Sequence, residues 1–233
     1  MQSGVTEQKK SQYVGFVFYR LRRAWWSLDE GAREQGKNEL NRVLEEYSSV
    51  MILRAYTTLG IRAECDFMLW RISYTLEDFY EMSAKMLKTS MGPYLQTVYS
   101  YLSISKRSTY IDKISPEHGE SRTTILPGKF KYIFVYPFIK TRAWYQLPLE
   151  TRQTMMDEHI RTGNKYPSVK LNTTYSFGLD DQEFVVAFES DVPKDFLDLV
   201  QELRESKASG YTLQDTPTFT CIAKPLAELL NDF

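Results

Sequence analysis

The chain repeats its own pattern after 117 residues, so it must adopt a fold that two copies of one unit can build together. At this spacing Phe18 matches Val135, Phe79 matches Phe196, and the apolar run at 67–70 matches the run at 184–187. In each copy, stretches rich in Val, Tyr and Phe alternate with stretches whose apolar residues recur every three or four positions. The pattern therefore predicts the order β-α-β-β-α-β twice.

This order predicts an α+β fold with two ferredoxin-like units in tandem, whose sheets pack together around a barrel-like interior. The predicted strands are at 13–21, 49–58, 65–73 and 95–104 in the first copy, and at 131–138, 168–177, 182–189 and 217–223 in the second. The predicted helices are at 29–46, 76–89, 148–162 and 193–206. We expect residues 1–104 to form the first repeat, 105–130 a connector loop, and 131–233 the second repeat.

Composition excludes several classes of function. A formal charge of −1, with both signs interspersed, gives no general reason to bind nucleic acid or an anionic membrane. No apolar run approaches the roughly 18 residues of a membrane-spanning helix, and 1–12 lacks the apolar stretch of a signal peptide. We therefore expect a cytoplasmic protein. Cys65 and Cys221 stand far apart, without a zinc-binding spacing, and are expected to be buried thiols.

One histidine distinguishes the second copy from the first. His159 lies on the predicted helix at 148–162, on or beside its apolar stripe, whereas the 117-residue spacing places Arg42 opposite it. A histidine in such a position can be a hydrogen-bonded core residue or a metal ligand. Because the chain has only two histidines, an iron bound here would need most of its ligands from a cofactor. Haem supplies four nitrogens and requires one ligand from the protein.

The segment before this helix is basic and aromatic. Five cations and no carboxylate lie between Ser121 and Leu149, namely Arg122, Lys129, Lys131, Lys140 and Arg142. They can form a solvated basic surface or bind the carboxylates of a ligand. Tyr136 and Trp144 in the same segment can pack in a core or contact an aromatic ligand.

Three stretches of the second copy carry a resemblance to a known family. They are YPFIKTRAWYQLP at 136–148, MMDEHIRTGNKYPSVKLNTTYSFGLDD at 155–181, and RxxxASGYTLQDTPTFTC at 204–221. With them the chain resembles the chlorite dismutase-like haem proteins, and among these the branch of coproheme decarboxylases. The resemblance is clearest over 120–222.

This resemblance implies a dimeric α+β barrel, a homopentamer, and haem or iron-coproporphyrin bound in the second copy. The implied activity is an oxidoreductase reaction in which hydrogen peroxide drives decarboxylation of two porphyrin propionates, giving haem b through a tyrosyl radical. The implied roles are His159 as iron ligand, Tyr136 as the radical, Lys140 as its basic partner, Arg122 as a propionate ligand, and Trp144, Leu171 and Ser209 as further porphyrin contacts.

Two positions depart from the family pattern. Chlorite dismutases carry an arginine where this chain has Leu171, and a leucine offers no charge or hydrogen bond to a chlorine oxide. The family has glutamate where this chain has Lys207, and an ammonium group cannot accept the N–H of a ligand histidine. We expect Glu205 or a backbone carbonyl to replace that acceptor, or the histidine to donate more weakly. Alternative functions are a non-catalytic haem-binding protein, a weak haem peroxidase or, less favoured, a chlorite dismutase.

Overall fold

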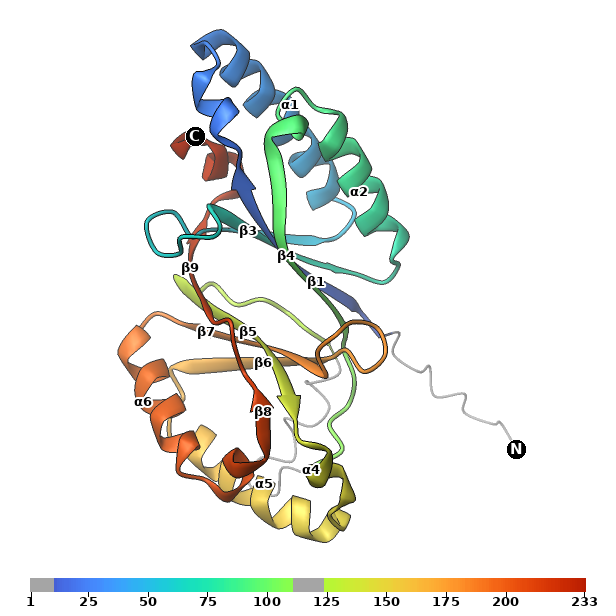
Figure 1. Ribbon diagram of the computed structural model, residues 1–233, viewed down its shortest axis with the longest axis vertical. Helices are drawn as coiled ribbons and strands as arrows, with labels where there is room; N and C mark the ends of the chain where they lie inside the picture. Colours follow the sequence, from blue (N-terminus) through green and yellow to red (C-terminus); the bar gives the residue numbers. More distant parts are fainter. Residues whose placement is uncertain (1–10, 111–123) are drawn as a thin grey trace, which may run out of the picture.

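A computed structural model describes residues 11–110 and 124–233 and gives two successive sets of strands and helices (Figure 1). The first set comprises β1 (Tyr13–Leu21), η1 (Arg23–Ser27), α1 (Glu30–Ser48), β2 (Ile52–Thr57), β3 (Phe67–Ser73), α2 (Glu77–Lys88), η2 (Gly92–Tyr94) and β4 (Leu95–Ile104). The second comprises β5 (Tyr132–Lys140), α4 (Arg142–Gln146), α5 (Leu149–Gly163), β6 (Val169–Tyr175), β7 (Phe184–Ser190), α6 (Pro193–Arg204), η3 (Lys207–Tyr211), β8 (Thr212–Gln214), β9 (Phe219–Lys224) and η4 (Leu226–Asp232). The predicted α+β class is confirmed.

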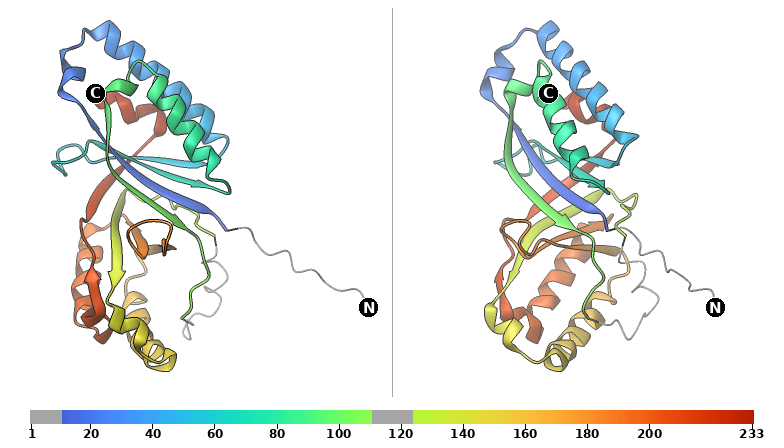
Figure 2. Two further views of the ribbon diagram at one scale, coloured as in Figure 1. Left: turned by 45° about the vertical axis from the view of Figure 1, so that its right-hand side comes forward. Right: turned by 90° about the vertical axis from the view of Figure 1, so that its right-hand side faces the viewer.

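The strands form one large antiparallel sheet in the order β7-β6-β4-β1-β3-β2-β9-β5-β8. β7 also pairs with β5. The strands from β7 to β5 therefore form a closed ring of pairs, and β8 pairs with β5 outside this ring. The two halves meet where β2 pairs with β9 and where Ile104 of β4 pairs with Tyr175 of β6. In two views the helices α1 and α2 lie at one end of the molecule, α5 and α6 lie at the other, and the strands lie between them (Figure 2). Both halves therefore share one sheet.

A hydrophobic cluster between the two halves joins them. β1 and β3 contribute Phe16, Phe18 and Trp70, while Val135 of β5 and Phe219 of β9 come from the second half. The Phe18 and Phe219 rings stack with their centroids 4.0 Å apart. Successive residues of a strand point to opposite faces, so the alternate residues of the same strands face the helices.

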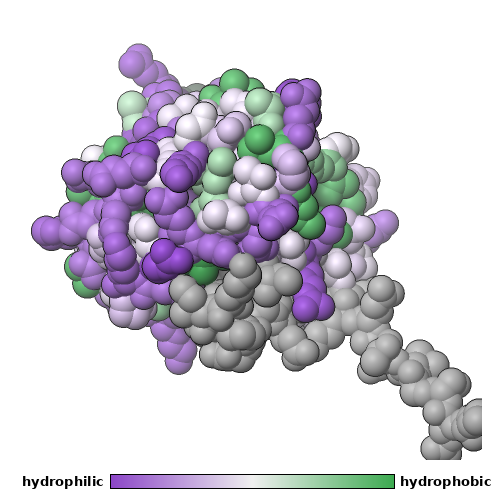
Figure 3. Space-filling view, turned by 90° about the horizontal axis from the view of Figure 1, so that it is seen from below, coloured by the Kyte–Doolittle hydropathy of each residue, from purple (hydrophilic) through white to green (hydrophobic). Residues whose placement is uncertain are grey.

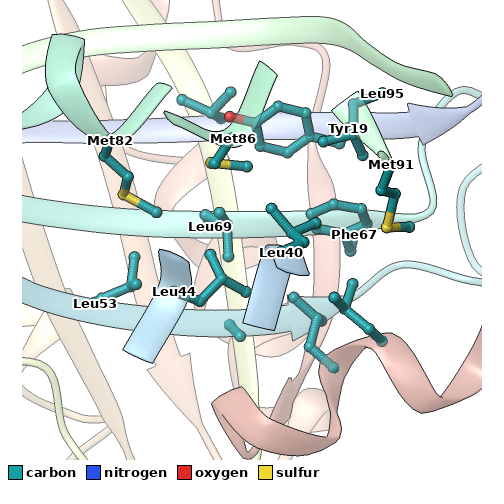
Figure 4. Close-up of a cluster of buried hydrophobic side chains, with 14 of the residues drawn as sticks. Tyr19, Leu40, Leu44, Leu53, Phe67, Leu69, Met82, Met86, Met91 and Leu95 are labelled. Atoms are coloured by element: carbon teal, nitrogen blue, oxygen red, sulfur yellow. The ribbon is translucent and has the colours of Figure 1, made fainter. Parts of the chain in front are cut away.

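The helix layers on the two outer faces are filled very differently. Twenty buried residues pack between α1, α2 and the sheet in the first half, including Leu40, Leu44 and Met82 (Figure 4). The chain's last turn also contributes, because Leu229 and Leu230 of η4 belong to this cluster. The corresponding cluster of the second half has five buried residues among those described.

The register of the strands corrects the repeat distance. β1 and β5 begin 119 residues apart, whereas β3 and β7 begin 117 apart. The pairing of Val17 with Leu69 in the first half corresponds to that of Tyr136 with Val186 in the second. A uniform shift of 117 is therefore wrong for β5 and for the helix that follows it. The physical reason is that the connection from β5 to β7 is two residues shorter than that from β1 to β3.

The corrected alignment changes the counterpart of His159. The sequence RAW occurs at 23–25 and again at 142–144, which places Trp25 opposite Trp144 at the spacing of 119. At the same spacing His159 lies opposite Leu40, and the expected match with Arg42 is wrong. Leu40 is fully buried in the core of the first half.

The predicted repeat elements are all present, with ends that differ by a few residues. The short elements α4, β8 and η4 were not predicted, and the division at 104 and 130 into domains remains a prediction. In the described part of the chain, no helix combines the length and apolarity needed to cross a membrane.

Replacing Leu40 by alanine will lower the free energy of unfolding by about 2–5 kcal/mol, because it leaves a cavity in a filled core. Chemical denaturation measures the change. The matched control is Leu197→Ala on α6, where the leucine is 59% exposed and the expected change is within about 0.5 kcal/mol. Equal effects at the two positions would contradict the described packing.

Candidate functional site

The match with Leu40 places His159 on the side of α5 that faces the sheet. Its counterpart Leu40 packs inward against the first half, whereas α5 buries only Thr162. The Nδ1 atom of His159 is enclosed and has no hydrogen-bond partner among the described residues, although part of the residue stays accessible. A ligand would therefore have to reach the ring from the Nε2 side.

The surroundings keep the imidazole neutral. Burial and, to a smaller extent, the nearby Lys140 charge lower the pKa of His159 from 6.5 to about 4, and Glu158 partly opposes this shift. A neutral imidazole is the form that binds metals. No group of three His, Cys, Asp or Glu side chains that could hold a bare metal ion occurs among the described residues. Any iron here would thus need the ligands of a macrocycle.

The sheet opposite α5 offers an open apolar surface. Leu171 of β6 pairs with Phe188 of β7, and Phe188 belongs to the cluster that packs against α6. Since paired residues lie on the same face of a sheet, Leu171 faces the helices, yet it is 47% exposed. Its counterpart Leu53, which pairs with Arg71, is 6% exposed. The sheet surface at Leu53 is covered in the first half, whereas the matching surface at Leu171 is open in the second half.

Lys140 lies at the end of β5 and is directed toward η3. Its ammonium nitrogen donates to the carbonyl oxygen of Ala208 at 2.6 Å and lies 4.6 Å from the centroid of the Trp144 ring. Burial lowers the pKa of Lys140 to about 8, although Glu183 partly opposes the shift. The lysine is thus held close enough to His159 to disfavour protonation of the imidazole.

Trp144 and Ser209 lie on the short elements beside α5. Trp144 of α4 is 2% exposed, its Nε1 donates to the Tyr110 hydroxyl at 3.1 Å, and its ring lies 5.5 Å from that of Tyr211. Ser209 of η3 is partly exposed, and its backbone N–H donates to Ser206. Trp144 is therefore mainly a supporting residue, whereas Ser209 remains accessible to a ligand.

Neither expected replacement for the missing glutamate reaches His159. Glu205 follows α6 and is exposed, the Ala208 carbonyl is occupied by Lys140, and Nδ1 has no partner among the described residues. Lys207 is exposed as well. Of the three outcomes predicted for this position, the geometry fits the weaker histidine donor.

Tyr136 is located among aromatic and charged groups that the sequence did not single out. Its ring stacks on Phe188 with centroids 6.1 Å apart. Burial raises the pKa of the Tyr136 phenol above its ordinary value, Asp215 raises it further, and Arg204 lowers it. Arg204 and Asp215 form an ion pair with each other. Both residues lie in the stretch at 204–221 that carries the family resemblance, so the sequence offered a reason to consider them as site residues.

Lys140 is not among the charges that act on the Tyr136 phenol, since its ammonium is held by Ala208 and Trp144. Arg122 lies outside the described residues. Of the other cations in this segment, Arg142 is mostly exposed and lies 3.7 Å from Glu183. Seen from the end formed by the second half, the surface is largely hydrophilic with scattered hydrophobic residues (Figure 3).

An α+β protein with one neutral, enclosed histidine opposite an open apolar sheet face fits the class of haem-binding proteins. Residues 33–224 match the family described as chlorite dismutase, and the chain belongs to this family. It is 31% identical over 179 residues to the coproheme decarboxylase of Mycolicibacterium smegmatis, covering 76% of this chain and 74% of the relative.

Solved structures support the same assignment. Chlorite dismutase from Candidatus Nitrospira defluvii in complex with imidazole has a TM-score of 0.86 and 26% identity, covering 95% of this chain and 94% of that one. A haem-binding protein from Thermus thermophilus has a TM-score of 0.83 and 26% identity over the same shares of the two chains.

Replacing His159 by glutamine will reduce the acid sensitivity of the porphyrin-free protein. Because the folded pKa of about 4 lies below the ordinary 6.5, the unfolded chain binds a proton in this window that the folded chain does not. The free energy of unfolding therefore falls as the pH drops from 6.5 to 4, by up to about 3 kcal/mol.

Urea denaturation at pH 7 and at pH 4.5 gives the free energy of unfolding at each pH. The change between the two pH values should be larger for wild type than for His159→Gln. Thr154→Ala on the exposed side of α5 is the matched control and should keep the wild-type pH dependence. An identical pH dependence for wild type and His159→Gln would show that the imidazole is not held neutral.

Proposed function

We propose that the protein binds an iron porphyrin between α5 and the strands β6 and β7, where His159 would supply the protein's ligand to the iron. The observation that carries the proposal is the enclosed Nδ1 of a neutral histidine facing a sheet surface on which Leu171 is half exposed. A porphyrin is a broad apolar disc, and burying Leu171 beneath it would be favourable. The residues present fit such a group, because one imidazole is the one ligand that haem requires.

We further propose that the substrate is iron-coproporphyrin and that the product is haem b. The relative from M. smegmatis bears the name coproheme decarboxylase, and both chains share more than two thirds of their length. For each of two propionates, one hydrogen peroxide is reduced to two water molecules, while the propionate loses carbon dioxide and becomes a vinyl group. When bound, the iron supplies the reaction with peroxide that generates the oxidant.

The chain's own residues would then relay the oxidation and hold the substrate. Tyr136 faces the helix side of β5, gives up an electron and its phenolic proton, and recovers a hydrogen atom from the β-carbon of the propionate. Because the high pKa keeps the phenol protonated at neutral pH, loss of the electron must be accompanied by loss of the proton. Arg204, Arg122 and Lys140 supply cations for the propionates.

Several wider assignments belong to the same proposal. The return of the strand pairing from β5 to β7 supports a barrel of two ferredoxin-like units. By resemblance to the family we propose a homopentamer in the cytoplasm, with no nucleic acid or membrane partner.

A binding protein or a weak peroxidase is the second candidate, and one observation favours it. The histidine lacks a hydrogen-bond acceptor at Nδ1 among the described residues, so it would donate less electron density to the iron than a histidine paired with a carboxylate. Chlorite dismutation is a third candidate, favoured by the likeness to solved chlorite dismutases. Leu171 opposes it, since it offers no charge to a chlorine oxide. Evolution of oxygen from chlorite would identify that activity.

Tyr136→Phe will retain tight binding of iron-coproporphyrin but lose decarboxylation, because the hydroxyl that carries the hydrogen atom is gone. Mass analysis of the pigment after titration with hydrogen peroxide counts the formic acid equivalents lost, with two expected for wild type. Tyr132→Phe on the same strand and face is the matched control and should lose two as well. A normal rate in Tyr136→Phe would refute the radical role, and no loss in wild type would favour the binding protein.

His159→Ala will weaken porphyrin binding and change the absorption spectrum of the bound iron, because its axial nitrogen is removed. Visible absorption during titration with iron-coproporphyrin measures both effects. Thr154→Ala, at an exposed position earlier on α5, should match wild type. An unchanged spectrum in His159→Ala would exclude this residue as the ligand.

A further inference from the structure

The first half contains a buried cation without an opposing charge among the described residues. Arg71 of β3 is 6% exposed, and its guanidinium carbon lies 4.7 Å from the centroid of the Phe79 ring. Gly15 of β1 borders both groups, because a Cβ added there would lie 3.3 Å from the Phe79 ring and 3.6 Å from Nε and Nη2 of Arg71. The guanidinium therefore packs closely between the backbone of β1 and the Phe79 ring.

The hydrogen bonds of Arg71 are incomplete. Nη1 donates to the Ser83 hydroxyl at 2.9 Å and to the Phe79 carbonyl at 3.4 Å. Nε is buried and has no partner, and no carboxylate forms an ion pair with Arg71 among the described residues. The neighbouring Tyr19 does not supply a negative charge, because burial raises the pKa of its phenol. A buried cation without a paired charge is costly, so an anion at this position would be stabilised.

Arg71 borders a pocket of about 150 Å³ between α2 and the strands β1 and β4, which is open to the surface beside Leu87, Thr97 and Ser100. Its lining combines hydroxyl groups with apolar side chains, among them Tyr19, Ser83, Met86, Leu95 and Ser100. Tyr19 and Met86 lie side by side in the close-up of this core (Figure 4). By volume alone, the pocket matches enclosed apolar cavities that bind benzene.

The second half has no such cation at the matching position. Arg71 pairs with Gly15 and Leu53, and Phe188 pairs in the same way with Phe134 and Leu171. Phe188 therefore replaces Arg71 in the half that carries His159. The duplicated frame has acquired a histidine in one helix layer and a guanidinium in the other.

We propose that the cavity beside Arg71 is a second binding site, which takes a small organic carboxylate with an apolar body. The carboxylate binds the guanidinium and the Ser83 hydroxyl, and the apolar body lies against Met86 and Leu95. The site is separate from the proposed porphyrin site, because its residues all belong to the first half.

Benzoate is the probe for this site, and benzamide is its neutral match in shape. Isothermal titration calorimetry of the full chain at neutral pH should show one benzoate site, both in the porphyrin-free and in the porphyrin-saturated protein. Arg71→Met should weaken it by at least about tenfold, as expected for lost hydrogen bonds to a charged group. Arg20→Met, on an exposed position of β1, should bind benzoate like wild type.

A second variant keeps the test decisive if Arg71→Met fails to fold. Ser100→Phe places a ring at the cavity from an exposed position of β4 and should abolish benzoate binding without affecting Arg71. Absence of saturable benzoate binding to wild type, equal binding of benzamide, or undiminished binding in Ser100→Phe would overturn the proposal. Failure of the protein to bind porphyrin would leave the benzoate result unchanged, so the two proposals are tested separately.

Discussion

Close packing beneath α1, and its absence beneath α5, is the constraint on which the site depends. Protein interiors are normally filled as densely as organic crystals. Leu40 and Leu53 meet this requirement in the first half, whereas their counterparts His159 and Leu171 leave accessible surface between the helix and the sheet. The shared cluster between the halves and the close packing beneath α1 stabilise the frame in which this space stays open.

The position of Lys140 at the end of β5 determines the charge beside His159. Lys140 ends β5 where its ammonium can reach the Ala208 carbonyl and the Trp144 ring, so a positive charge lies beside His159. Burial and this charge keep the imidazole neutral, and its Nδ1 has no hydrogen-bond partner among the described residues. The result is a histidine free to bind a metal but without a carboxylate to strengthen it. If His159 is the iron ligand, as proposed, the lack of a carboxylate partner at Nδ1 would reduce its electron donation.

Periodicity in the sequence predicts the two rounds of strands and helices, because apolar residues three or four positions apart and runs rich in Val, Tyr and Phe recur in the same order in both halves. It does not predict the repeat distance, since a difference of two residues in the connections alters the register without altering the pattern. The strand pairing, the helix starts and the RAW repeat at 23–25 and 142–144 together show that His159 replaces Leu40. The short elements α4 and β8 depend on tertiary contacts, and the approach of Arg204 and Asp215 to Tyr136 depends on folding of the chain after α6.

The most direct test of the central claim is a crystal structure of the protein with iron-coproporphyrin, with iron located by its anomalous scattering. The account predicts one iron peak within bonding distance of Nε2 of His159, with Leu171 covered by the macrocycle on its opposite face. An iron peak elsewhere, or a porphyrin-soaked crystal in which side chains fill the space between His159 and Leu171, would contradict it.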